Sequence, residues 1–153
     1  MNVARYITLM LLAALLLSSC AKNTVSKIPQ ISLIAFRPDT AMKVNLDTVF
    51  IEFHLVDGDG DIGNDTISRV FLQDSRVPGT FIGYDFPQID GSIEDPKKGL
   101  EGLCIFLPVP QPVPRPDTVH SKYGDTLSYE FYITDRAGHA SNHIVTHSLI
   151  IRP

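Results

Sequence analysis

Alternation of apolar and polar residues is the feature of this sequence that most restricts its fold. Residues 49–56 alternate, with Glu52 and His54 on the polar face, and a period of two is that of a half-buried β-strand. The alternation recurs in 127–134 and in 143–151. Weaker candidate strands lie at 31–36, 67–72, 80–84 and 103–107. Because no window of helical period and length follows residue 20, the sequence predicts an all-β chain.

About seven strands separated by turn residues are typical of an antiparallel immunoglobulin-like β-sandwich. The segment 135–142, DRAGHASN, resembles the last hairpin of many bacterial immunoglobulin-like domains. In such a turn Gly138 supplies the positive φ and Asp135 caps the backbone. The chain has no tryptophan and two cysteines, so the cysteine–tryptophan–cysteine pattern of antibody domains is absent and the resemblance concerns the architecture alone.

The first 19 residues have the features of a secretory signal. Arg5 precedes an apolar stretch at 7–17, which is too short to cross a bilayer as a helix because crossing takes about 20 residues. The stretch ends in LSSC, which resembles a bacterial lipobox. That resemblance implies cleavage before Cys20, acylation of Cys20 and a stable membrane anchor. We therefore expect a lipoprotein signal peptide at 1–19, a lipidated tether at 20–27 and one β-sandwich domain at 28–153.

Prolines concentrate in residues 85–118, which hold seven of the 11 in the chain, five of them at every second position from Pro108 to Pro116. Each proline lacks the N–H that a strand ladder needs, so such a run is excluded from a central strand. The sequence therefore predicts a stiff, extended connector or edge segment within the domain. Recognition of this run by a partner is the alternative.

A run of aspartates and glycines, DGDGDIGND at 57–65, follows the clearest strand. Carboxylates this close repel one another unless a hard cation such as calcium lies among them. Asp57, Asp59, Asp61 and Asp65 match ligand spacings of the helix–loop–helix calcium template, and the sandwich topology brings Asp135 to the same, membrane-facing end. Because the template's bidentate glutamate is missing, we expect weak binding, about 10⁻⁴–10⁻³ M. A solvated acidic turn is the alternative.

A lipobox, a strand running into DGDGDIG and a closing DRAGHxSN hairpin together resemble the uncharacterised small lipoproteins of Bacteroidota. The resemblance implies an envelope location and an immunoglobulin-like fold, and it carries no activity. No aspartate follows Cys20 at the position that retains such lipoproteins in the inner membrane. We therefore expect a location at the outer membrane, on either its periplasmic or its surface face.

The dipeptide Asp-Thr followed by an aliphatic residue occurs five times and is similar to the D-[ST]-aliphatic signal for O-glycosylation of exported proteins in that phylum. The candidate threonines are Thr40, Thr48, Thr66, Thr118 and Thr126. The alternative is structural, because aspartate often ends a turn and threonine often opens a strand. The sequence leaves both interpretations open.

Motifs for catalysis are scarce. Cys104 lies in an apolar run without a base nearby, which favours a buried, inert thiol. His139, His143 and His147 recur every four residues, yet a zinc site would need a third ligand such as His54 from another strand. Surface histidines are the simpler interpretation. Because no nucleophile elbow, phosphate-binding glycine loop or metalloprotease helix is present, we expect no enzyme.

The sequence thus predicts a lipid-anchored envelope lipoprotein that acts as a non-catalytic binding or scaffolding module. A net charge of −4 argues against a nucleic-acid partner, and the identity of a protein or glycan partner stays open. One alternative is a glycan-binding accessory protein of a polysaccharide uptake system, with Tyr84, Phe86, Tyr123 and Tyr132 as candidate stacking residues. Another is an envelope hydrolase, for which two carboxylates would have to meet in a cleft.

Overall fold

The computed structural model describes residues 25–63, 67, 69–86 and 99–153, and in these residues the chain is mainly strand and loop. The strands are β1 (Gln30–Arg37), β2 (Ala41–Lys43), β3 (Phe50–Asp57), β4 (Arg69–Asp74), β5 (Ile82–Asp85), β6 (Leu100–Phe106), β7 (Asp125–Leu127), β8 (Tyr129–Thr134), β9 (Ile144–Val145) and β10 (Leu149–Arg152). One helical turn, α2 (His120–Tyr123), follows the proline-rich run. The prediction of an all-β chain is confirmed.

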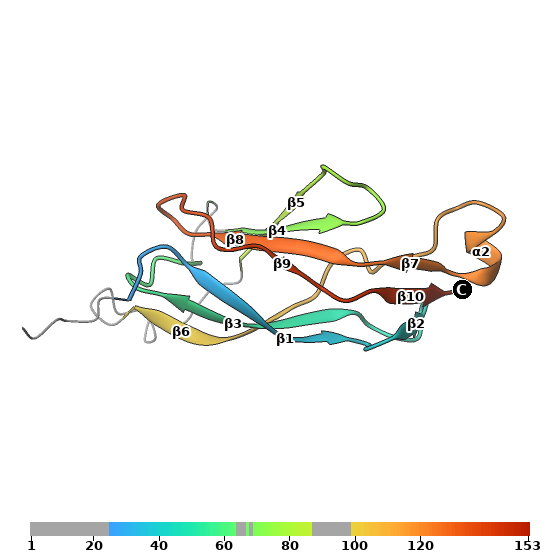
Figure 1. Ribbon diagram of the computed structural model, residues 1–153, viewed down its shortest axis with the longest axis horizontal. Coiled ribbons are helices and arrows are strands. Elements are labelled where there is room, and N and C mark those ends of the chain that lie inside the picture. Colours follow the sequence, from blue (N-terminus) through green and yellow to red (C-terminus); the bar gives the residue numbers. More distant parts are fainter. Residues whose placement is uncertain (1–24, 64–66, 68, 87–98) are drawn as a thin grey trace, which may run out of the picture.

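Two layers of strands form a sandwich (Figure 1). One sheet has the order β1-β3-β6 and the other has the order β5-β4-β8-β9. A third ladder, β2-β10-β7, lies at the end near the C-terminus, where β2 follows β1 of the first sheet and β7 leads into β8 of the second. These orders correspond to strands A-B-E and C′-C-F-G of an immunoglobulin-type sandwich.

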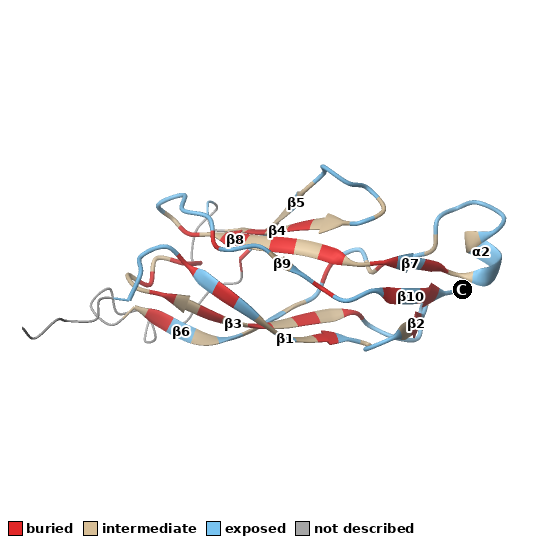
Figure 2. Ribbon diagram, viewed as in Figure 1, coloured by how far each residue is buried: buried red, intermediate tan, exposed pale blue. Residues whose placement is uncertain are grey.

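The core lies between the layers, where alternate side chains of β3, β4, β8 and β10 are buried (Figure 2). Ile51, Phe53 and Leu55 of β3 and Phe131 and Ile133 of β8 are all at most 1% exposed. The rings of Phe53 and Phe131 lie 5.5 Å apart and join the two sheets. Burial of side chains of this size stabilises the fold by roughly 1.5–3 kcal/mol each. The alternation seen in the sequence is therefore what holds the layers together.

Residues 143–151, predicted as one strand, form two. β9 pairs with β8, whereas β10 pairs antiparallel with β7 and parallel with β2. Between them, Tyr129 N–H donates to Thr146 Oγ1 at 2.9 Å and Thr146 N–H donates to the Tyr129 carbonyl at 2.8 Å. A side-chain oxygen thus replaces a backbone acceptor, which interrupts the ladder. The parallel β2–β10 pair departs from the antiparallel order that the sequence predicts.

The segment 85–118, predicted as an extended connector or edge, contains β6, and residues 87–98 lie outside the described residues. After β6, residues 107–119 form neither strand nor helix and include bends at 109–110 and 116–117 and a turn at 118–119, so this part is not extended throughout. Gln111 attaches the run to the sandwich. Val49 N–H donates to Gln111 Oε1 at 2.6 Å, and Gln111 Nε2 donates to the carbonyls of Val49 at 3.2 Å and Pro108 at 2.7 Å. A side-chain amide thus supplies the hydrogen bonds that neighbouring prolines lack.

Candidate cation site

Three segments meet at the end of the sandwich opposite α2 (Figure 1). β3 ends at Asp57 and continues into residues 57–63, which we call the acidic loop. β8 continues into Asp135 and the β8–β9 turn. The described chain begins at residue 25, and residues 25–28, which we call the stem, precede β1 at the same end.

Close approaches of backbone explain two glycines at this end. Gly58 N–H donates to the Ser26 carbonyl at 2.8 Å, and a Cβ on Gly58 would lie 2.4 Å from the Val25 carbonyl oxygen and 2.5 Å from that of Ser26. Gly99, just before β6, has a φ of +72°, and its Cβ would lie 2.4 Å from the Asp57 carbonyl oxygen. Only residues without a side chain allow the segments to pack this closely.

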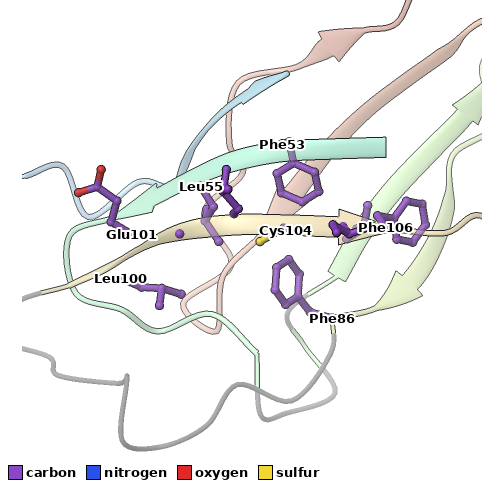
Figure 3. Close-up of a pocket in the computed structure, with 11 residues that line it drawn as sticks. Phe53, Leu55, Phe86, Leu100, Glu101, Cys104 and Phe106 are labelled. Atoms are coloured by element: carbon purple, nitrogen blue, oxygen red, sulfur yellow. The ribbon is translucent and has the colours of Figure 1, made fainter. Parts of the chain in front are cut away.

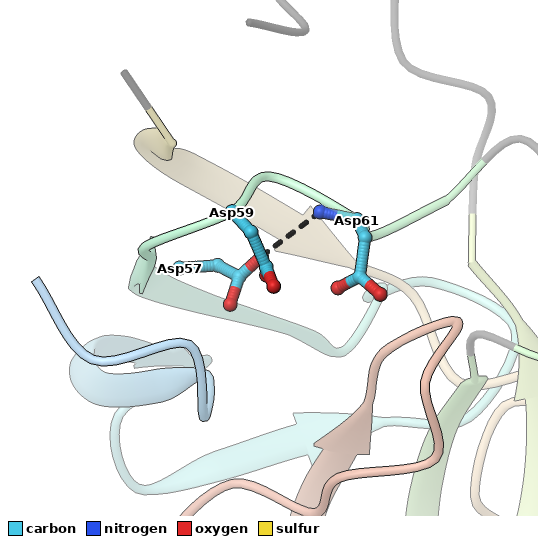
Figure 4. Close-up of side chains that lie close together, drawn as sticks. All are labelled: Asp57, Asp59 and Asp61. Atoms are coloured by element: carbon cyan, nitrogen blue, oxygen red, sulfur yellow. Dashed lines mark hydrogen bonds between the residues drawn. The ribbon is translucent and has the colours of Figure 1, made fainter. Parts of the chain in front are cut away.

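Asp57, Asp59 and Asp61, which we call the triad, point toward a common space beside the loop (Figure 4). One oxygen of each carboxylate lies within 4.8 Å of one oxygen of both others. In each carboxylate Oδ1 is buried and has no hydrogen-bond partner among the described residues. Oxygens that bind one calcium ion at 2.3–2.6 Å lie at most about 5 Å apart. The triad therefore has the dimensions of a chelating site.

The other oxygen of each carboxylate has a partner that orients the side chain. Asp57 Oδ2 accepts the Asp61 N–H at 3.0 Å, and Asp61 Oδ2 accepts the Ala137 N–H at 3.1 Å. Asp59 Oδ2 lies 3.5 Å from Lys27 Nζ. Each side chain is thus held through Oδ2, while its buried Oδ1 has no partner among the described residues.

Burial and mutual repulsion disfavour the ionised triad. Asp57 is 1% exposed. Its burial raises its pKa to about 6, against the hydrogen bond from Asp61 N–H, and the charges of Asp59, Asp61 and Asp135 add to the rise. Burial, followed by the charges of Asp135 and Asp59, also raises the pKa of Asp61. A divalent cation among the carboxylates would reverse this balance, because its own charge favours the ionised forms.

Asp135, predicted as a further ligand, is fully buried near the triad, and both of its oxygens have a partner. Oδ1 accepts the His139 N–H at 2.7 Å, and Oδ2 lies 2.8 Å from His139 Nδ1. This hydrogen bond and the charge of Asp135 raise the pKa of His139. Asp135 therefore caps the β8–β9 turn, where Gly138 has the expected positive φ of 85°. Asp65 lies outside the described residues.

The acidic loop is held between the stem and the β8–β9 turn. Arg136 N–H donates to the Asp61 carbonyl at 2.9 Å and Arg136 Nη1 donates to the Gly63 carbonyl at 3.3 Å. On the other side lies the hydrogen bond from Gly58 to Ser26. The sequence indicated that the turn would share this end. It also indicated that the first strand would start there, but it gave no signal for the hydrogen bond to the stem, because the acceptor is a backbone carbonyl, which every residue possesses.

The threonines of the Asp-Thr pairs are exposed wherever the structure describes them, at Thr40, Thr48, Thr118 and Thr126. Cys20 and Thr66 lie outside the described residues. The preceding aspartates contribute to local structure: Asp47 accepts the Lys43 N–H at 2.8 Å, and Asp117 accepts the His120 N–H at 2.8 Å. The structural role of these aspartates and the accessibility of the threonines coexist, so both interpretations of the pairs stand.

In the described part of the chain, the histidines considered as zinc ligands do not come together. His143 stacks on Tyr132 with centroids 4.5 Å apart, whereas His147 packs on Phe36 at 5.1 Å. The opposite face of Tyr132 stacks on Phe71 at 4.9 Å. Because both ring faces of Tyr132 are covered, this residue offers no open face for stacking on a sugar.

An apolar cavity of about 310 Å³ opens beside β6 and is lined by Phe53, Phe86, Cys104 and Phe106 among others (Figure 3). Burial raises the pKa of the Cys104 thiol to about 11, so the thiol is protonated at neutral pH. Glu101 is the charged residue in the described lining. The cavity thus brings no acid–base pair to the cysteine.

Comparison of the chain with protein-family models, with curated protein sequences and with solved structures found no match. Within the described residues, no helix has the length and apolar character needed to cross a membrane. The functional interpretation therefore rests on the geometry of the acidic loop and on the sequence that precedes it.

Proposed function

We propose that this chain is a lipid-anchored, non-catalytic β-sandwich module of a bacterial outer membrane, stabilised by calcium at the end next to its anchor. The observation that carries the proposal is Asp57, which is 1% exposed, has an unpartnered Oδ1, and has one oxygen within 4.8 Å of one oxygen each of Asp59 and Asp61. Burial of an ionised carboxylate is costly unless a cation pairs with it. Three such oxygens in one place are the ligands of a hard cation.

Calcium fits the triad better than zinc or magnesium. Zinc sites in proteins are built mainly from sulfur and nitrogen ligands, whereas the triad offers carboxylate oxygens alone. Magnesium demands near-ideal octahedral geometry and retains several waters, while calcium accepts six to eight oxygens in flexible arrangements. Backbone carbonyls and waters at an open loop supply the remaining ligands of such an ion.

The position of the stem supports an anchor beside this site. Val25 is five positions after Cys20, so a lipid on Cys20 lies within about 18 Å of the stem even if the chain between them is fully extended. A module anchored there presents its opposite end, with α2, to a partner in the envelope. Scaffolding or binding at that end is the role that this arrangement favours.

Calorimetric titration with calcium tests the site. The processed full chain, in detergent and freed of metal by a chelator, should bind one calcium ion with a Kd of about 10⁻⁴–10⁻³ M. Asp59→Asn removes one ligand and should weaken binding at least about tenfold. Asp85→Asn makes the same chemical change at a side chain that is 76% exposed on β5, and it should bind like the wild type. Absence of binding at about 10 mM calcium would exclude the site.

The anchor needs a separate test. Cells that express the chain should incorporate labelled palmitate into it, and Cys20→Ser should abolish both this incorporation and its recovery in the membrane fraction. A Cys104→Ser variant is the matched control, because Cys104 is on β6 within the sandwich. Incorporation that depends on Cys104, or membrane recovery unchanged by Cys20→Ser, would contradict the proposed anchoring.

A further inference from the structure

The acidic loop makes the polar contacts that hold the stem on the sandwich. Gly58 N–H donates to the Ser26 carbonyl at 2.8 Å, and Lys27 Nζ lies 3.5 Å from Asp59 Oδ2. Within the described chain, no other part of the sandwich forms a hydrogen bond or ion pair with residues 25–28. Pairing of β1 with β3 starts only at Gln30. The position of the stem thus depends on the conformation of the acidic loop.

The same loop residues face both the triad and the stem. The Oδ2 of Asp59 lies near Lys27, while its buried Oδ1 has no partner, so Oδ1 is available to a cation while Oδ2 pairs with the lysine. Gly58 stands between Asp57 and Asp59 in the chain, and the direction of its N–H is therefore set by where these two carboxylates lie. Convergence of the triad and docking of the stem are parts of one loop conformation.

We propose that calcium in the triad clamps the stem onto the sandwich and thereby shortens the free tether between the domain and its lipid anchor. This inference rests on the proposed function. Without a cation, repulsion among the three carboxylates favours an open loop, which removes the contacts of Gly58 and Asp59 with the stem. With calcium bound, the loop conformation that docks the stem is the stable one. Because such coupling is reciprocal, a docked stem strengthens calcium binding by the same factor.

The clamp changes the reach of the tether. With the stem docked, the chain runs five residue steps from Cys20 to Val25, which span at most about 18 Å. With the stem released, it runs ten residue steps from Cys20 to Gln30, the first residue of β1, and these span at most about 36 Å. Calcium would therefore halve the largest distance between the sandwich and the membrane.

Gly58→Ala separates docking of the stem from the calcium ligands. The added Cβ would lie 2.4 Å and 2.5 Å from two stem carbonyl oxygens, which expels the stem, while the three carboxylate side chains themselves are not altered. Gly102→Ala is the matched control, because a Cβ there meets nothing within 4 Å. Both variants are made in the processed full chain in detergent. Two measurements are compared: cleavage after Lys27 by a lysine-specific endoproteinase, and the calorimetric Kd for calcium.

In the wild type and in Gly102→Ala, calcium should slow cleavage after Lys27 at least about tenfold relative to chelator. In Gly58→Ala, cleavage should be fast in both conditions, and calcium should bind roughly three- to tenfold more weakly, which is the effect of losing about one hydrogen bond. Circular dichroism in chelator checks that each variant is folded.

Cleavage of the wild type at equal rates with and without calcium would overturn the clamp, and this arm needs no variant. So would a folded Gly58→Ala that binds calcium with the wild-type Kd and is protected by it. Either result would leave the calcium site itself standing if the wild type binds calcium in the calorimeter. A wild type that does not bind calcium would overturn the proposed site and the clamp together.

Discussion

Asp57→Asn should give a protein that is more stable than the wild type in chelator and less stable in calcium. The asparagine oxygen still accepts the N–H of Asp61, and its NH₂ group puts a donor into a cluster whose carboxylate oxygens lie within 4.8 Å of one another. The variant therefore removes a buried charge and supplies donors at the same time. In chelator we expect a gain in the free energy of unfolding on the order of 2 kcal/mol.

In calcium the wild type should be more stable than Asp57→Asn, because the wild type keeps three carboxylate ligands and the variant keeps two. A ligand that binds only the folded state at 100 times its Kd stabilises it by about 2.7 kcal/mol. Urea unfolding in chelator and in calcium measures both effects. Asp85→Asn, an exposed substitution of the same kind, should change stability by less than about 0.5 kcal/mol in either condition. If Asp57→Asn is destabilising in chelator, burial and repulsion of the ionised triad do not lower the stability of the metal-free protein.

The difference in stability between the wild type and Asp57→Asn should depend on pH with a definite sign. Burial raises the pKa of Asp57 from 3.8 to about 6, so the folded state holds this proton more tightly than the unfolded state does. In chelator, the contribution of Asp57 to stability is therefore greatest below pH 3.8, falls between pH 3.8 and about 6, and stays low above that. His139, whose pKa is also raised, is present in both proteins. The advantage of Asp57→Asn over the wild type should thus grow from pH 4 to pH 6 and then level off.

Local patterns in the sequence were sufficient to predict the principal strands and the acidic loop. Alternation marks β3 and β8 because one face of each is buried, and the spacing of Asp57, Asp59 and Asp61 is visible without a structure. The break at Thr146 was not predictable from alternation, since it depends on a side-chain hydroxyl that bonds to a backbone N–H 17 residues away. Contacts between distant segments leave no periodic signal.

The stem and the turn illustrate the same limit within the site. The charge of Asp135 suggested a ligand, but its oxygens are taken by His139, four residues further along the chain. The contact of Gly58 with Ser26 joins two backbone groups, and a glycine in an acidic turn has an ordinary explanation without it. Only the close approach of two chain segments shows why alanine would not serve at Gly58.

A second charged cluster, at the end of the sandwich near α2, is centred on Asp125, whose side chain is 1% exposed. Its Oδ2 accepts hydrogen bonds from Arg76 Nη1 at 3.1 Å and Arg115 Nε at 2.9 Å, and its Oδ1 accepts them from Arg115 Nη2 at 2.9 Å and Thr126 N–H at 2.7 Å. Burial alone would raise the pKa of Asp125, but the hydrogen bonds from Arg115, Thr126 and Arg76 outweigh it and hold the pKa well below its usual range. Arg76 also pairs with Asp74 at 2.6 Å. The cluster ties the segment after β4 and the proline-rich run to β7.

Asp125→Ala should therefore destabilise the sandwich by about 3–5 kcal/mol at pH 7, because it leaves Arg76, with a side chain 13% exposed, without its buried partner. Asp39→Asn, which disturbs an exposed pair with Arg37, should cost less than about 1 kcal/mol. The lowered pKa means that Asp125 stabilises the fold above pH 3.8 and loses this effect as the pH falls further, so the wild type and Asp125→Ala should converge in acid. Urea unfolding at pH 7 and at pH 3 measures both differences. A loss below about 1 kcal/mol at pH 7 would mean that Asp74 alone satisfies Arg76 and that the proline-rich run is held mainly through Gln111.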